Sequence, residues 1–290
     1  MTSIAANGID IEYDASGNPS DPPLLLVMGL GAQLIAWDDE FVRELVSRGF
    51  YVIRFDNRDQ GLSTGFDEAG VPDVAAALTT GRLPEPVYLL SDMADDAAGL
   101  LDALGIPRAH VCGASMGGMI AQSLVIHNPA KVLTLVSIMS TTGDPSVGTP
   151  HPEALAVLMQ PAQTDRDAVI ESAVKAWAVI GSPGFRRDDE RVRAAAAAAF
   201  DRAFHPEGTA RQLVAIVSSP DRTAALGAVT CPTLVVHGEA DPLVDPSGGR
   251  ATADAIPGAE LWTIPGMGHD LPPELFAPVA DRIATHCLRA

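Results

Sequence analysis

Short apolar segments alternate with longer amphipathic segments along most of the chain. The short segments are rich in β-branched and aliphatic residues, which predicts strands, and the longer ones repeat their apolar residues at helical spacing. We expect strands at Ile9–Tyr13, Leu24–Met28, Tyr51–Asp56, His110–Gly113, Leu133–Ile138, Thr233–His237 and Glu260–Ile264. We expect helices at Asp38–Arg48, Ser91–Leu104, Met116–His127 and Pro273–Cys287.

This order of elements indicates an α/β fold. The later strand segments, such as Leu133–Ile138 and Thr233–His237, are continuously apolar. Strands have this character when helices cover both faces of a parallel sheet. The sequence therefore predicts a mostly parallel central sheet flanked by helices.

The alternation stops between Thr142 and Val229, where only helical patterns occur. Four helices are expected in this segment, at Glu153–Gln160, Asp165–Ile180, Asp188–Ala203 and Pro206–Ser219. Ligands of open α/β sheets bind outside the carboxyl ends of the strands, and a helical insertion between two strands is well placed to cover that end. We expect a core of residues 1–142 and 223–290 and a helical cap, or lid, at 143–222.

One predicted strand ends in a Gly-x-Ser-x-Gly motif. The motif spans Gly113–Gly117 and directly precedes a helical pattern. A strand, a tight turn and a helix in this order form a nucleophile elbow, which lifts the serine hydroxyl clear of the backbone. Glycine is required two residues to either side, because the turn leaves no room there for a Cβ. The motif predicts Ser115 as a nucleophile.

A serine nucleophile needs a base to take its proton and an acid to orient that base. His269 lies in a glycine-rich loop directly after the last predicted strand. Asp241 lies in a short turn after the strand at Thr233–His237. We therefore expect Ser115, His269 and Asp241 to form a catalytic triad, with Asp144 as the alternative acid.

The other histidines and the cysteine beside the elbow are assigned structural roles. Cys112 lies on the strand before Ser115 and is expected to be buried as a small apolar residue. The remaining histidines lie at strand ends, near helix ends or in the helical insertion: His110, His127, His151, His205, His237 and His286.

Ester hydrolysis also requires hydrogen-bond donors placed in advance for the developing oxyanion. The N–H of Met116 is one expected donor, since it follows Ser115 at the start of a helix. The other is expected from the turn Met28–Gly31 after an early strand, where we choose the N–H of Leu30.

Charge and composition exclude several classes of function. The formal charge is −18, from 37 acidic and 19 basic residues, which argues against nucleic-acid binding. No run of eighteen apolar residues occurs and the N-terminus has no signal-peptide pattern, so we expect no membrane span and a cytoplasmic location. Cys112, Cys231 and Cys287 have no metal-ligand spacing. We expect no metal and no cofactor, and the sequence is compatible with a monomer or a homodimer.

These motifs and their order resemble the α/β-hydrolase superfamily. The segment Arg54–Thr64 is similar to the family's Asp-x-Arg-Gly-x-Gly-x-Ser sequence, with Asp59 in place of its first glycine. Asp56 and Arg58 in this segment are expected to fix a loop through charge-assisted hydrogen bonds. Met28-Gly29-Leu30 stands where many members carry His-Gly-x.

Within the superfamily, the chain is similar to bacterial esterases of the aclacinomycin methylesterase type. The similarity lies in the Val-Met-Gly sequence that begins at Val27, in Asn57–Thr64 and in Ile264–His269. It implies that a serine acyl-enzyme hydrolyses carboxylic esters, with methyl esters as one candidate class. We expect a small to medium, largely apolar ester substrate. The expected pocket walls are Met119, Met159, Trp177 and Phe185.

The sequence leaves three alternative functions open. The segment Ala114–Gln122 is also similar to 3-oxoadipate enol-lactonases, so lactone hydrolysis is the main alternative. Carbon–carbon bond hydrolases share the triad order but usually carry Trp after the histidine, where this chain has Asp270. The most remote alternative is a non-catalytic ligand receptor on the same fold. Serine at position 115 argues against dehalogenases and epoxide hydrolases, which use aspartate.

Overall fold

A computed structural model describes residues 2–73 and 84–289 of the chain. Within them an eight-stranded sheet has the order β1-β2-β4-β3-β5-β6-β7-β8. Its strands are β1 (Thr2–Ala6), β2 (Ile9–Ser16), β3 (Pro23–Val27), β4 (Tyr51–Phe55), β5 (Ala109–Ala114), β6 (Val132–Ile138), β7 (Thr233–Gly238) and β8 (Glu260–Ile264). β2 pairs antiparallel with β1 and β4, and all other pairs are parallel. The predicted mostly parallel sheet is confirmed.

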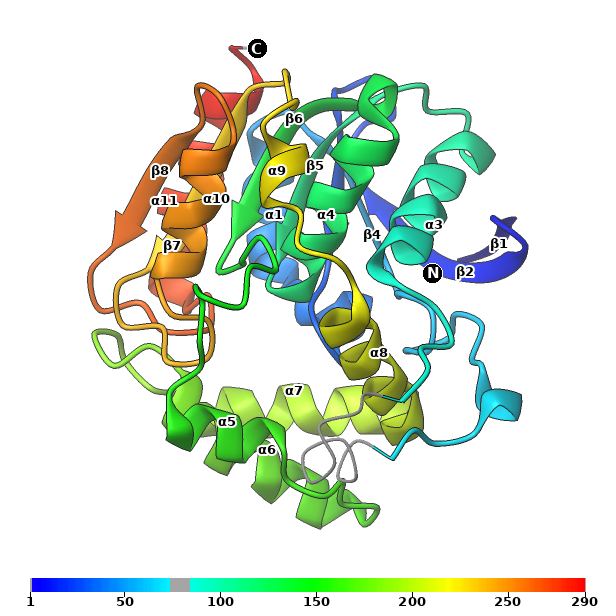
Figure 1. Cartoon of the computed structure of the whole chain (residues 1–290), viewed down its shortest axis with the longest axis vertical. Coiled ribbons are helices and arrows are strands. Elements are labelled where there is room, and N and C mark those ends of the chain that lie inside the picture. Colours follow the sequence, from blue (N-terminus) through cyan, green and yellow to red (C-terminus); the bar gives the residue numbers. More distant parts are fainter. Residues whose placement is uncertain (1, 74–83, 290) are drawn as a thin grey trace.

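Helices cover both faces of this sheet (Figure 1). On one face lie α3 (Leu90–Ala103), α4 (Met116–His127), α9 (Thr223–Leu226) and α10 (Ser247–Ala255), and on the other α1 (Asp39–Ser47) and α11 (Phe276–Cys287). Short 3-10 turns occur at Leu34–Ala36, Asp67–Ala69, Pro129–Lys131 and Pro273–Leu275. No helix in the described part of the chain has the length and apolar character to cross a bilayer.

The apolar strands divide their side chains between two core clusters. Leu25 and Val27 of β3 belong to the cluster under α3 and α4, while Leu24 and Leu26 belong to the cluster under α1 and α11. Successive side chains of a strand point to opposite faces. A run of leucines is therefore what a strand needs when helices cover both of its faces.

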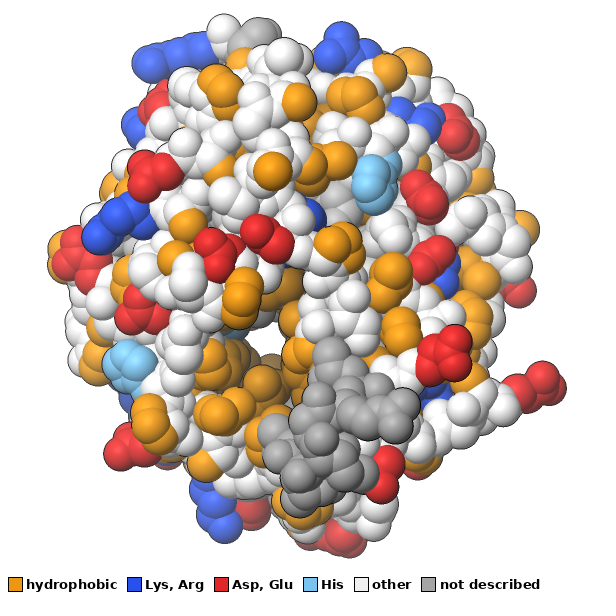
Figure 2. Space-filling view, in the orientation of Figure 1, with side chains coloured by type: hydrophobic (Ala, Val, Ile, Leu, Met, Phe, Trp, Pro, Cys, Tyr) orange, Lys and Arg blue, Asp and Glu red, His pale blue; other side chains and the backbone are white. Residues whose placement is uncertain are grey.

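The segment between β6 and β7 is helical, as predicted. It contains α5 (Pro152–Leu158), α6 (Arg166–Ile180), α7 (Asp189–Arg202) and α8 (Pro206–Ser218). In Figure 1 α5, α6 and α7 lie beyond the carboxyl ends of the parallel strands, and α8 lies beside them. Figure 2 shows a hollow between these helices and the core, with mainly hydrophobic side chains around it.

Three elements were not predicted. β1 pairs only with β2 at the edge of the sheet and is mostly exposed, so it carries no apolar alternation. The helix α9 has four residues. The helix α10 begins Ser247-Gly248-Gly249, and glycine disfavours helices. The fold requires both glycines, because a Cβ on Gly249 would lie 2.3 Å from the ring of His237 and one on Gly248 2.8 Å from Thr141.

Candidate active site

Ser115 lies on a sharp turn between β5 and α4. Its backbone has φ 55° and ψ −122°, a combination that residues with a Cβ adopt only under strain. The Ser115 N–H donates to the carbonyl of Ile138 at the end of β6 (2.9 Å). The Ser115 carbonyl accepts from the Gly118 N–H (2.9 Å) and the Ser140 hydroxyl (2.8 Å). Neighbouring elements thus fix the turn from both sides.

The two glycines of the motif lie where a side chain has no room. A Cβ on Gly113 would lie 2.1 Å from the carbonyl oxygen of Gly117. A Cβ on Gly117 would lie 2.0 Å from the carbonyl oxygen of Val27 at the end of β3. Both distances are far below a van der Waals contact. Glycine at these positions lets α4 begin directly against the sheet.

Asp241 and His269 meet Ser115 at the carboxyl ends of β5, β7 and β8. The His269 Nε2 lies 2.9 Å from Ser115 Oγ, and the His269 Nδ1 lies 2.8 Å from Asp241 Oδ2. Asp241 and His269 are both buried. The structure therefore brings together three side chains that the sequence places in separate segments.

The carboxylate of Asp241 is held by several donors. Its Oδ1 accepts from the N–H groups of Leu243 (2.9 Å) and Val244 (3.0 Å), and its Oδ2 also lies 3.5 Å from His237 Nε2. Burial favours a higher pKa, but hydrogen bonds from His237, His269 and the Val244 N–H lower the pKa of Asp241 to about 2. An ionised Asp241 accepts the Nδ1–H of His269, which leaves the Nε2 lone pair facing the serine hydroxyl.

The turn after β3 borders Ser115 on its other side. A Cβ on Gly29 would lie 3.2 Å from Ser115 Cβ and 3.7 Å from Ser115 Oγ. In the described part of the chain, the N–H groups of Leu30 and Met116 have no hydrogen-bond acceptor. Met116 directly follows Ser115, and Leu30 directly follows Gly29, which lies beside Ser115. Two free donors are thus available in the turns expected to supply them.

The loop that carries His269 is held by the helical segment. The His269 N–H donates to the carbonyl of Ile180 (2.7 Å), and the Gly268 N–H donates to the Ser182 hydroxyl (2.8 Å). The Ser182 hydroxyl itself donates to Asp270. This hydrogen bond favours a lower pKa of Asp270, but burial has the larger effect and raises it. The sequence carried no signal for these contacts, because they join two glycine-rich loops through mostly backbone atoms.

Asp56, Arg58 and His237, which were predicted to have structural roles, are buried and form polar contacts. Asp56 forms an ion pair with Arg202 (2.8 Å), and Arg58 forms one with Asp96 (2.5 Å), so both fix the loop after β4. His237 is buried, and its Nε2 lies 2.8 Å from the carbonyl of Val244.

The alternatives to the predicted nucleophile and acid lie in other surroundings. Asp144 accepts from the N–H (2.8 Å) and the hydroxyl (2.7 Å) of Ser146. Cys112 is completely buried, and burial raises the pKa of its thiol well above the usual value. A thiol in that state is a poor nucleophile.

The residues expected to line a pocket are spread over both parts of the molecule. Met119 is buried in the first turn of α4, and its N–H donates to the Ser115 carbonyl (3.2 Å). Phe185, after α6, packs against the core cluster that includes Met267. Met159 directly follows α5, and Trp177 on α6 is 37% exposed. A role of these side chains in the pocket stays a prediction.

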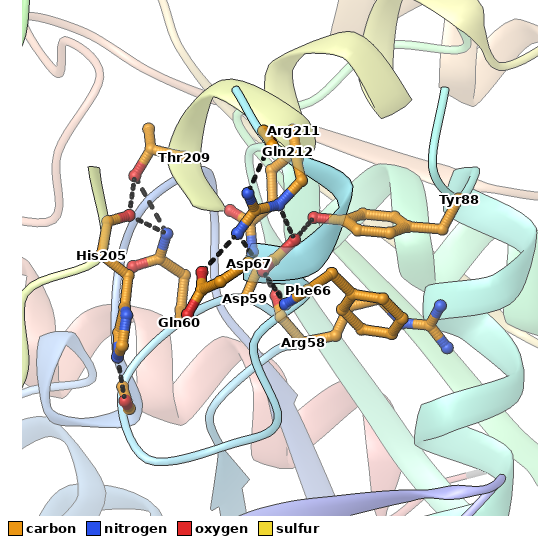
Figure 3. A network of polar contacts seen from close by, with 12 residues as sticks. Arg58, Asp59, Gln60, Phe66, Asp67, Tyr88, His205, Thr209, Arg211 and Gln212 are labelled. Carbon is orange, nitrogen blue, oxygen red and sulfur yellow. Dashed lines mark hydrogen bonds and ion pairs between the residues drawn. The ribbon is translucent and has the colours of Figure 1, made fainter. Parts of the chain in front are cut away.

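Sequence reasoning missed a polar network between α8 and the loop after β4 (Figure 3). Arg211 Nε and Nη2 donate to the two carboxylate oxygens of Asp59 (2.8 and 2.7 Å), and the Tyr88 hydroxyl donates to the same carboxylate (2.6 Å). Asp59 has φ 67°, where glycine is favoured. Burial opposes ionisation, but the hydrogen bonds from Arg211 and Tyr88 lower the pKa of Asp59. A charged residue at a glycine position was the available signal, although its partner lies 152 residues away.

Comparison with known proteins identifies the family to which the fold belongs. Residues 22–274 match the alpha/beta hydrolase fold family. Rhodomycin D methylesterase DauP from Streptomyces sp. (strain C5) is 33% identical over 98% of this chain and 96% of that protein. A thermophilic esterase from Thermogutta terrifontis superposes with a TM-score of 0.73 at 26% identity, over 100% of this chain and 98% of that one.

A further solved structure shares the fold at lower identity. The enol-lactonase from Burkholderia xenovorans LB400 superposes with a TM-score of 0.77 at 23% identity, over 99% of this chain and 100% of that one. Short motifs indicated a resemblance to the aclacinomycin methylesterase type. The 33% identity with a methylesterase, which extends over 98% of this chain, confirms it. The family match and the relationship to DauP show that the chain belongs to the alpha/beta hydrolase fold family.

Proposed function

We propose that the chain is a serine hydrolase that cleaves carboxylic esters through an acyl-enzyme. The observation that carries this proposal is the hydrogen-bonded series Ser115 Oγ, His269 and Asp241, with contacts of 2.9 and 2.8 Å. A hydroxyl paired with a neutral imidazole, which is itself oriented by a carboxylate, is the arrangement that activates serine. The relationship to a methylesterase supports an ester as the substrate.

In the proposed reaction, His269 Nε2 takes the proton of Ser115 as Oγ attacks the ester carbonyl. The resulting oxyanion is stabilised by the N–H groups of Leu30 and Met116. Protonated His269, stabilised by Asp241, gives its proton to the alcohol oxygen as the carbon–oxygen bond breaks. Water then attacks the acyl-enzyme, again with His269 as the base, and the acid leaves with Ser115 restored.

The helical segment at 143–222 is proposed to cap this site over a core of residues 1–142 and 223–290. The hollow of Figure 2 supports a largely apolar substrate, because hydrophobic side chains surround it. Met119, Met159, Trp177 and Phe185 are the proposed walls. Methyl esters are the first class to test, because DauP is a methylesterase. A cytoplasmic location is also proposed, in agreement with three free cysteines.

Covalent labelling tests the proposed nucleophile. A fluorophosphonate should label the wild-type protein stoichiometrically and leave Ser115→Ala unlabelled, with the adduct located on Ser115 by mass spectrometry. Cys112→Ala is the matched control and should be labelled like the wild type. A native protein that stays unlabelled while correctly folded would exclude the enzyme and favour a ligand receptor.

A substrate panel tests the bond that is cleaved. It would contain p-nitrophenyl esters of increasing acyl length, methyl esters of larger carboxylic acids, and lactones. The proposal expects kcat/KM to be highest for esters. A consistent preference for lactones would identify a lactonase instead, with the same triad.

A further inference from the structure

Residues 28–34, named here the oxyanion loop, connect β3 to the next 3-10 turn. Core residues hold both of its ends. Asn57 Nδ2 donates to the carbonyl of Met28 (2.8 Å), and the Leu34 N–H donates to Asp56 Oδ1 (2.7 Å). The middle of the loop, which contains Leu30, has one internal hydrogen bond, from the Ala32 N–H to the carbonyl of Gly29 (3.3 Å), and is also supported by α8.

Gln212 of α8 supports the middle of the oxyanion loop. Its Oε1 accepts from the Gly31 N–H (2.9 Å), and its Nε2 donates to the carbonyl of Arg58 (2.8 Å). The side chain is completely buried. Only the amide oxygen can accept and only the amide nitrogen can donate, so these two partners fix the orientation of the amide.

Gly31 adopts a backbone conformation that glycine reaches without strain, so contacts with neighbouring residues restrict its peptide. It has φ 68°, in the left-handed region. A Cβ there would lie 3.0 Å from the side chain of Thr209, one turn before Gln212 on α8. The Leu30–Gly31 peptide is thus held between two residues of α8. The preceding peptide, Gly29–Leu30, carries the N–H that is proposed to bind the oxyanion.

The helix α8 is itself fixed to the core beside Gln212. Arg211 pairs with Asp59, and Gln60 Nε2 donates to the Thr209 hydroxyl (2.9 Å), as Figure 3 shows. The side chains of Arg211 and Asp59 are both buried. A buried, bidentate ion pair holds a helix in one position more firmly than an exposed one. Gln212 therefore projects from a fixed support.

We propose that Gln212 is a positioning residue, which holds the Leu30 N–H in the direction required by the oxyanion. The proposal rests on the proposed function, because it needs an oxyanion to form at Ser115. A donor is effective only when it is aimed before the charge develops, and a displacement of about 1 Å is enough to lose on the order of 100-fold in rate. The helical segment would in this way supply part of the catalytic geometry without touching substrate.

The test is Gln212→Met, which keeps the length of the side chain and removes both hydrogen bonds. We expect kcat/KM for p-nitrophenyl butyrate to fall about 100-fold. Butylboronic acid adds to the serine and places an oxygen in the oxyanion site, so its Ki should rise by a comparable factor. The Ki of butan-1-ol, a neutral ligand of similar length with no anionic or carbonyl oxygen to stabilise, should not change. A wild-type kcat/KM or an unchanged boronic acid Ki would overturn the proposal.

Two further variants separate positioning from stability. Ser219→Ala removes another contact of α8, in which the Ser219 hydroxyl accepts from the Leu90 N–H (3.0 Å), and should leave both Ki values unchanged. Gln212→Glu keeps an acceptor for the Gly31 N–H but buries a carboxylate. A positioning role expects Gln212→Glu to be more active than Gln212→Met although less stable, and a purely structural role expects the activities to follow stability.

The failure of this proposal is distinguishable from that of the proposed function. If fluorophosphonate labels the wild type and Gln212→Met keeps full kcat/KM, only the positioning role is wrong. If Gln212→Met does not fold, Gln212→Asn decides, because its shorter side chain keeps an amide but does not reach the Gly31 N–H. A folded Gln212→Asn protein with a weaker Ki for butylboronic acid supports the role, and one with the wild-type Ki contradicts it.

Discussion

At the scale of single residues, the strain at Ser115 is maintained by its neighbours. A backbone at φ 55° and ψ −122° costs on the order of 1–3 kcal/mol and persists only in rigid surroundings. Those surroundings are the β6 carbonyl that accepts from the Ser115 N–H and the two glycines that let α4 begin against the sheet. The conformation exposes Oγ at the carboxyl edge of the sheet.

Gly117→Ala should therefore be strongly destabilising. The new Cβ would overlap the carbonyl oxygen of Val27, and moving either backbone segment disrupts the turn. We expect a loss of about 3 kcal/mol or more in the free energy of unfolding, measured by urea denaturation. Gly65→Ala is the control, since its Cβ would lie 3.5 Å or more from its neighbours. Equal stabilities for the two variants would contradict the geometry.

Asp241→Asn should lower kcat steeply and leave KM nearly unchanged. An asparagine can donate to His269 Nδ1, which stabilises the tautomer whose Nε2 carries a proton and cannot accept one from Ser115. In a serine protease this change lowers kcat about 10⁴-fold, and we expect a similar loss with p-nitrophenyl esters. Asp144→Asn should behave like the wild type. The opposite pattern would make Asp144 the acid.

These residues show what local sequence can predict. Ser115, Asp241 and His269 each follow an apolar strand, and parallel strands bring their carboxyl ends together. Ser182 and Gln212 could not be found in this way. Each binds a backbone N–H of a distant loop, that of Gly268 or of Gly31, and a backbone N–H leaves no mark in the sequence.

At the scale of elements, an ion pair between Arg211 and Asp59 joins α8 to the core, and both side chains of the pair are buried. Arg211→Met leaves the Asp59 carboxylate buried without its counter-ion, for which we expect a loss of about 3–5 kcal/mol in the free energy of unfolding. Asp59→Gly combined with Arg211→Met removes both charges and restores a residue suited to φ 67°. The double variant should recover most of the loss.

Urea denaturation of both variants checks this prediction. The matched control is Arg166→Met, which removes an exposed ion pair with Asp201 and should leave stability almost unchanged. A double variant less stable than Arg211→Met alone would mean that the ion pair is not the main contact of α8.

Elements with a continuous pattern were predicted well, and those shaped by their surroundings were not. All seven predicted strands and the four helices predicted between residues 143 and 222 are present, with ends that differ by at most three residues. The helix α10 was not predicted because it contains two glycines, which disfavour helices. These glycines are needed because His237 and Thr141 leave no room for a Cβ. This need depends on contacts that form only in the folded chain.

At the scale of the whole molecule, buried histidines should make stability depend on pH. His110, on β5, is buried beside Thr134 and Phe50. Burial, together with repulsion from His286, lowers its pKa from 6.5 to about 4. Between these values the unfolded chain binds a proton that the folded chain does not. The stability that comes from keeping His110 neutral is therefore fully present above pH 6.5 and is lost as the pH falls to 4. The free energy of unfolding should fall by up to about 3 kcal/mol over this range.

His110→Asn tests this dependence, because asparagine offers Thr134 a polar partner without a titrating group. The variant is expected to be less stable at pH 7, and its free energy of unfolding should fall less steeply between pH 6.5 and 4. His127→Gln, at an exposed histidine, should keep the wild-type slope. Parallel slopes for all three proteins would show that His110 titrates normally in the folded state.

The contacts of Ser182 with the His269 loop and of Gln212 with Gly31 also constrain how this enzyme can diversify. If the segment 143–222 were a separate module, a chimera could exchange it for that of a relative and acquire the relative's substrate range. Here the donor segment must also bring a hydroxyl that reaches Asp270, an amide that reaches Gly31 and a cation that reaches Asp59. If Gln212 positions the oxyanion donor as proposed, we expect a chimera lacking these groups to lose turnover on every substrate. New specificity is therefore reached more readily by single substitutions on α5 and α6 than by recombination of whole segments.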